Sequence, residues 1–162
     1  QFKKPAKKEL LMSDKVISII PQNPFEKINP AALKSAAKTL KSKLKTDEIS
    51  FFSQQVPHFV DCGQNFTSIK CPCCATTIDF GWWGDAMSAA SELNFESLQI
   101  ITSCCHHKTT LNDLIYDYPC GFACCGITLL NPIVSNDQNL SELLQTAQSA
   151  LNTPLKIIHC RR

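Results

Sequence analysis

The chain has 162 residues, of which 44% are hydrophobic and 19% charged, and this is the size of one ordinary domain that can bury a core. No apolar run approaches the ~20 residues of a membrane-spanning helix, so the sequence predicts no membrane segment. The formal net charge of +2 comes from residues 1–11, which hold four lysines and one acid. Because Met12 is typical of a translation start, we interpret residues 1–11 as an extension or added tail. Residues 12–162 then form a single domain that is nearly neutral.

Ten cysteines indicate either a disulfide framework or a metal site. Disulfide frameworks are typical of short secreted chains with a signal peptide, and the basic residues at the start are not followed by the apolar run of such a peptide. We therefore expect a reduced, cytoplasmic protein with a metal site.

The first third of the chain predicts a strand, a helix and two short strands. The β-branched run 16–20 favours a strand, and leucines and alanines at helical spacing predict a helix from Pro30 to about residue 45. Residues 49–52 and 57–61 favour two strands with a break between them. Four lysines form a stripe along this predicted helix, beside its apolar stripe: Lys34, Lys38, Lys41 and Lys45. The stripe is either a solvated helix face or a docking surface for an acidic partner or a phosphate backbone.

The strongest local signal is Cys71-Pro72-Cys73-Cys74. A C-x-x-C pair in a tight turn lets two thiolates share one tetrahedral Zn²⁺, here through Cys71 and Cys74 with Cys73 as a bystander. A redox C-x-x-C should open a helix, whereas residues 75–80 favour a strand, so we disfavour redox chemistry.

Trp82 and Trp83 lead into a predicted helix over residues 85–93. Adjacent residues on a helix point in different directions, so one tryptophan at the rim could anchor a partner. The alternative is that both pack against the metal knuckle and the sheet.

A strand over residues 98–102 should carry Cys104 and Cys105 to the first cysteine pair. Neighbouring cysteines are a less specific signal than a second C-x-x-C, because their side chains diverge unless the backbone turns sharply. We predict one structural Zn²⁺ on Cys71, Cys74, Cys104 and Cys105. Cys62, which by default is a small buried residue, is the reserve ligand, and either His106 or His107 could also fill the fourth position.

The last third predicts a strand over 121–130, a helix over 140–151 and a strand over 155–159. Cys124 and Cys125 should face opposite sides of their strand, so they are packing residues. We expect Asn112-Asp113 to cap the turn that holds the second cysteine group. Two strand–helix–strand units predict one layered α+β domain, with helices on one face of a sheet and a zinc-knuckle element inserted between the units.

The chain resembles an uncharacterised family of small bacterial CPxC…CC zinc-binding proteins, and the resemblance covers nearly all of residues 15–160. It is carried by residues 59–66, 71–74, 82–87, 104–105, 110–114, 118–123 and 130–132. The resemblance implies a zinc-ribbon-like element in an α+β domain and an immunity-like role in neutralising a toxin. The chain departs from the family at Ala75, where a glycine usually follows the first knuckle, and at Cys124-Cys125, where an arginine–phenylalanine-like pair is usual.

The sequence holds no Gly-rich phosphate loop, G-x-S-x-G motif or metalloprotease helix. Four thiolates close a zinc site, whereas a catalytic zinc needs an open position. Our leading hypothesis is a non-catalytic zinc-binding protein that binds another protein, such as a toxin or effector, through Trp82 and Trp83 or the lysine stripe. The alternatives are a nucleic-acid-binding zinc module, which the neutral charge of the domain disfavours, and a small zinc-dependent enzyme.

Overall fold

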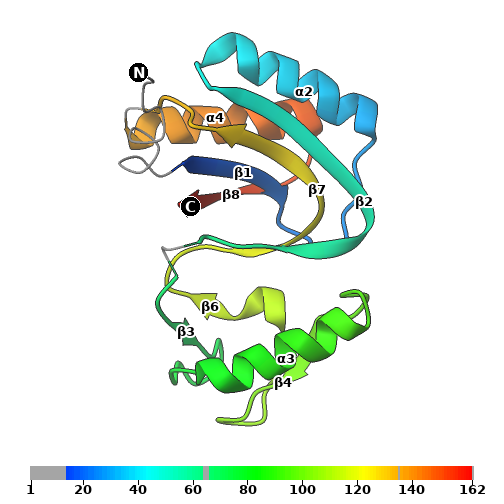
Figure 1. Ribbon diagram of the computed structural model, residues 1–162, viewed down its shortest axis with the longest axis vertical. Coiled ribbons are helices and arrows are strands. Elements are labelled where there is room, and N and C mark those ends of the chain that lie inside the picture. The colour runs from blue at the N-terminus through cyan, green and yellow to red at the C-terminus, as the bar shows by residue number, and fades with distance from the viewer. Residues whose placement is uncertain (1–13, 64–65, 135, 162) are drawn as a thin grey trace, which may run out of the picture.

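The protein is an α+β domain with a smaller element inserted into its sheet (Figure 1). The computed structural model describes residues 14–63, 66–134 and 136–161, so the tail predicted over residues 1–11 lies outside the described residues. Six elements form the main part: β1 (Lys15–Pro21), α2 (Pro30–Lys43), β2 (Glu48–Val60), β7 (Gly121–Leu130), α4 (Asp137–Leu151) and β8 (Leu155–Arg161).

The sheet has the strand order β2-β7-β1-β8, and every neighbouring pair is antiparallel. Each strand–helix–strand unit, β1-α2-β2 and β7-α4-β8, skips over one strand of the other unit. This is the ferredoxin-like βαββαβ plan. Both helices lie on one side of the sheet and the inserted element lies on the other (Figure 1). The predicted α+β class, with two such units and an insertion between them, is confirmed.

The insertion runs from residue 61 to residue 120 and leaves and returns at one point, because Val60 and Gly121 are register partners. Its elements are β3 (Ile69–Lys70), α3 (Phe80–Glu92), β4 (Gln99–Ile101), β5 (Lys108–Thr110), the 3₁₀ turn η1 (Leu111–Asp113) and β6 (Ile115–Tyr116). Strand β3 pairs with β6 and β4 with β5, which makes two small two-stranded ladders that lie near α3 (Figure 1).

Strand β2 is one continuous strand, so the prediction of two separate strands is wrong. Its pairing with β7 shifts register between Ser53 and His58, where Gln54 Nε2 bonds the Val56 carbonyl (3.0 Å) and His58 Nδ1 (2.8 Å). A bulge of this kind bends a strand and increases its twist. The β2–β7 pair accordingly curls away from the rest of the sheet toward the insertion (Figure 1).

Two cores follow from this layout. The first lies between the sheet and α2 and α4, and it includes Ile17, Ile19, Leu33, Leu40, Cys125, Ile127, Leu129 and Leu143. The second lies inside the insertion around Ile69, Ile78, Leu98, Leu111, Leu114 and Phe122. Phe122 belongs to β7 and is fully buried, so the second core is anchored to the sheet. Cys124 and Cys125 are both buried, as predicted for packing residues.

Two helix boundaries differ from prediction. Helix α2 ends at Lys43, because Leu44 is extended, so Lys45 is not on the helix. Helix α3 begins at Phe80 rather than residue 85, because the Asp79 carboxylate caps it by accepting the Trp82 N–H (3.1 Å). Residues 75–80 are therefore not a strand; only Thr77 makes an isolated bridge. No described helix is long and apolar enough to cross a membrane.

Candidate metal centre

The four predicted cysteine ligands come together at the far end of the insertion. The sulfur atoms of Cys71, Cys74, Cys104 and Cys105 all lie within 4.8 Å of one another. Cys71 Sγ is 3.8 Å from Cys105 Sγ, and Cys74 Sγ is 3.4 Å from Cys104 Sγ. A tetrahedral ion with metal–sulfur bonds of about 2.3 Å requires sulfur–sulfur distances of about 3.8 Å. The group is therefore spaced to hold one metal ion.

The cysteines sit on two turns with the same hydrogen bonds. In the first, the Ala75 N–H donates to the Cys71 carbonyl and the Cys71 N–H donates to the Thr76 carbonyl, both at 3.0 Å. In the second turn, His106 N–H donates to the Thr102 carbonyl and Thr102 N–H donates to the His107 carbonyl, again at 3.0 Å. The two turns, 71–76 and 102–107, are thus structural repeats of each other.

This repeat explains how adjacent cysteines can serve one site. The residue after the last cysteine of each turn has a positive φ, 61° at Ala75 and 54° at His106. These left-handed residues supply the sharp reversal that neighbouring cysteine ligands need. Cys74 and Cys105 occupy equivalent positions, as do Cys73 and Cys104.

Thr102 occupies the position that Cys71 holds in the first turn, and its role was not predicted from the sequence. Its side chain is fully buried, accepts the His107 N–H (3.0 Å) and places Oγ1 3.6 Å from Cys105 Sγ. The second turn therefore carries a hydroxyl where a C-x-x-C would carry a thiolate, and Cys104 completes the group instead. The signal in the sequence was the equal spacing of Thr102–Cys105 and Cys71–Cys74.

The protonation of the four thiols is uneven. Hydrogen bonds from the backbone N–H of Cys74 and then of Cys73 lower the pKa of Cys71 to about 6, and the Thr76 hydroxyl lowers the pKa of Cys74. Burial raises the pKa of Cys104. The Thr102 hydroxyl lowers the pKa of Cys105, but burial and the neighbouring thiols outweigh it and raise that pKa to about 12. A cation is needed before all four sulfurs can be thiolates together.

The reserve ligand Cys62 is not part of this group. It is fully buried at the junction between the insertion and the sheet, where its thiol lies 3.7 Å from the Tyr118 carbonyl. The next residue, Gly63 (φ 62°), bridges to Arg161 at the end of β8, and Cys62 lies outside the metal-binding group found among the described residues. His106 and His107 also lie outside the metal-binding group found among the described residues.

Asn112 and Asp113 act differently from the prediction. Asp113 closes the 3₁₀ turn through Thr110, whose hydroxyl donates to the Asp113 carboxylate (2.9 Å). Asn112 Oδ1 accepts the Phe122 N–H (3.1 Å), so it ties the insertion to the start of β7 and does not hold the cysteines.

Both tryptophans are half-buried and pack against the core of the insertion. Trp83 lies among Phe59, Phe66 and Tyr116, and its Nε1–H donates to the Tyr116 hydroxyl (3.2 Å). Both rings thus pack inward and stay partly exposed, so a contact role for one of them at the rim remains a prediction. Larger exposed fractions belong to Leu93 (64%) and to four more apolar side chains of the insertion, Phe80, Ile101, Ile115 and Tyr118.

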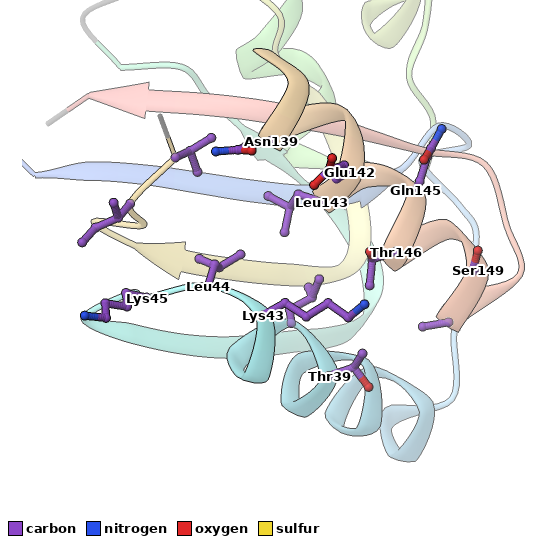
Figure 2. A pocket seen from close by; sticks show the side chains of 14 residues that line it. Thr39, Lys43, Leu44, Lys45, Asn139, Glu142, Leu143, Gln145, Thr146 and Ser149 are labelled. Atoms are coloured by element: carbon purple, nitrogen blue, oxygen red, sulfur yellow. The ribbon is translucent and has the colours of Figure 1, made fainter. Parts of the chain in front are cut away.

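The lysine stripe is divided between two grooves. Lys34, Lys38 and Lys41 line a groove of about 340 Å³ between α2 and β2. Lys45 instead lies with Lys43 at a groove of about 1010 Å³ between α2 and α4. Figure 2 shows this second groove, with Glu142, Gln145 and Ser149 on its α4 side.

None of the protein-family models, curated proteins or solved structures compared with the chain matches it.

Proposed function

We propose that the protein is a non-catalytic, cytoplasmic zinc-binding protein that acts by binding another protein. The observation that carries the proposal is the group of four cysteine sulfurs within 4.8 Å of one another at the end of the insertion. Sulfur ligands alone favour Zn²⁺ among the common divalent ions, and four of them leave no open position for a substrate. The zinc is therefore structural.

The role of the zinc is to hold the insertion in shape. The two small ladders of the insertion are only two and three residues long, so they cannot supply much stability by themselves. Zinc-binding energy becomes folding energy in elements of this kind. The ion joins the turn after β3 to the turn after β4 and so fixes both ends of the segment that contains α3.

Recognition of another protein is supported by what the two parts present at their surfaces. The insertion exposes Phe80, Leu93, Ile101 and Ile115, and the sheet domain exposes the lysines of α2. The partner class that we propose is a bacterial toxin or effector, which the protein neutralises as an immunity protein. The resemblance given by the sequence supports this partner class.

The test combines metal analysis with a defined partner. Elemental analysis of the purified chain should give about one zinc per chain, lost in Cys71→Ser but retained in Cys73→Ser. A toxin encoded beside the gene should then be co-expressed with each variant. We expect rescue of growth and a stable complex with the wild type and with Cys73→Ser. A metal-free wild-type protein, or zinc-dependent turnover of a substrate by the isolated chain, would overturn the proposal.

A further inference from the structure

Strand β2 leaves one edge of the main sheet open. It is the terminal strand in the order β2-β7-β1-β8, and residues 49–53 have no hydrogen-bonded neighbour on their outer side in the part of the chain that is described. These residues are Ile49, Ser50, Phe51, Phe52 and Ser53. An extended edge rich in apolar residues is a template for the addition of another strand.

The register shows which side chains border this edge on the helix side. Ile49 is paired with Leu129 and Phe51 with Ile127, and both partners belong to the core beneath α2 and α4. Ile49 and Phe51 therefore point toward α2. Phe51 remains 38% exposed, because α2 does not close over the edge.

Helix α2 overhangs the same edge with positive charge. The groove between them is lined by Lys34, Ala37, Lys38, Lys41, Ile49, Ser50 and Phe51, so it holds three ammonium groups and no carboxylate. None of the three lysines makes an ion pair with another described residue, and all three are exposed. The groove therefore combines the apolar side chains of Ile49 and Phe51, the unpaired backbone edge of β2 and three lysines that have no acidic partner among the described residues.

We infer that this groove binds an extended, acidic segment of the partner protein, which adds to the sheet as a strand beside β2. The inference rests on the proposed function, and it names the surface and the chemistry of the partner. Main-chain hydrogen bonds to the edge supply affinity, and side chains that alternate along the added strand supply specificity.

The spacing defines the sequence of such a segment. Every second residue of the added strand points toward α2, and these residues are about 7 Å apart. Lys34, Lys38 and Lys41 are about 6 and 4.5 Å apart along the helix, and their flexible stems absorb the difference. Glutamates at alternate positions therefore match the groove, because their carboxylates reach the lysines while their methylene groups lie against Ile49 and Phe51. The β-branched residues between them face the other side of the sheet. A nucleic acid would use the lysines but neither the open backbone nor the apolar floor, so a peptide fits better.

The experiment uses two labelled synthetic peptides and the zinc-loaded full chain. One peptide places three glutamates at alternate positions among valines and threonines, and the other has the same composition with its glutamates in one block. Fluorescence anisotropy should show binding of the alternating peptide at least about fivefold tighter. Two further peptides carry N-methyl groups on the backbone, one at the odd-numbered and one at the even-numbered residues. Only one of these two peptides should lose binding, because only one set of N–H groups faces β2.

The test variant and its control both replace a lysine of α2 by glutamate. Lys38→Glu should weaken the alternating peptide about tenfold, whereas Lys43→Glu, on the side of α2 that faces α4, should leave binding within about twofold. Equal losses in the two variants, or equal binding of the two peptides, would overturn the inference. Single-stranded DNA and unlabelled alternating peptide should also be compared as competitors. If the DNA displaces the labelled peptide at the lower concentration of the two, the groove binds a phosphate backbone and the inference is wrong.

Failure of this inference can be told from failure of the proposed function. If Lys38→Glu binds the neighbouring toxin as tightly as the wild type does, the recognition function stands and the β2 edge is not its site. Loss of toxin binding in Lys38→Glu, with retention in Lys43→Glu, supports both.

Discussion

Ala75 lies in a backbone conformation that suits glycine. Its φ of 61° places it in the left-handed region, which costs a residue with a Cβ about 1–2 kcal/mol. The turn needs this conformation to bring Cys74 toward the other three cysteines of the group.

We predict that Ala75→Gly raises the free energy of unfolding of the zinc-loaded protein by about 1 kcal/mol, because it removes this strain. Denaturant unfolding monitored by tryptophan fluorescence measures the change. The control is Ala89→Gly on the exposed side of α3, which should lower the free energy of unfolding by about 1 kcal/mol. A loss of stability in Ala75→Gly would show that the turn does not hold the left-handed conformation.

The equivalence of Thr102 and Cys71 predicts an exchange of ligands. Cys104→Ser should weaken zinc binding at least about tenfold, because it leaves three thiolates. Adding Thr102→Cys should restore binding, since the second turn then carries a C-x-x-C pair. Competition with a chromophoric chelator measures both affinities. Unchanged affinity in Cys104→Ser would mean that Cys104 is not a ligand.

The thiol pKa values predict how many protons zinc displaces. At pH 8 Cys71, with a pKa of about 6, is ionised, and the pKa of Cys74 is also lowered, whereas Cys105, with a pKa of about 12, and Cys104 keep their protons. Zinc binding should therefore release at least two but fewer than four protons per chain, and its affinity should fall as the pH falls. An indicator dye in weakly buffered zinc titrations measures the release. Release of four protons would mean that no thiol is ionised before the metal binds.

We expect the insertion to depend on the proposed zinc ion more than the sheet does. Removing zinc should unfold α3 and the small ladders while the sheet and α2 and α4 persist, because the main core contains none of the four cysteines. Both tryptophans of the chain lie in α3, so their emission reports on the insertion alone. We expect a red shift on chelation and loss of hydrogen-exchange protection only within residues 61–120. Loss of protection in β1 and β8 as well would show that the two parts fold as one unit.

The main elements could be predicted from the sequence because their signals are local. Apolar periodicity identified α2, α4, β7 and β8, and the C-x-x-C identified the first turn. The missed features depend on tertiary contacts. The bulge at residues 54–57 joins two apparent strands only because both halves pair with β7. The role of Thr102 depends on a hydrogen-bond pattern that is visible only when two distant turns are compared.

In the complete fold, the insertion occupies the place of a hairpin turn. Because Val60 and Gly121 are directly paired, a two-residue Asn-Gly turn could replace residues 61–120 without changing the sheet. We predict that the shortened chain folds with the same strand order and with lower stability, since Phe59 and Phe122 lose their contacts with the insertion. Amide NMR shifts of β1 and β8 provide the measurement.

A second shortened variant that carries Phe122→Thr removes the newly exposed ring and guards against aggregation. If neither shortened chain gives dispersed amide signals, the insertion is required for the sheet to form.

The position of the insertion also affects how fast the protein folds. The β2–β7 pairing has to close across residues 61–120, and the entropy lost on closing a loop grows with its length. A zinc ion bound as proposed would join Cys71 to Cys105 and so shorten the free path between the two strands. A chain that captures zinc early therefore has a smaller barrier to pairing β2 with β7. The zinc ion proposed to stabilise the insertion would then also make the sheet form faster.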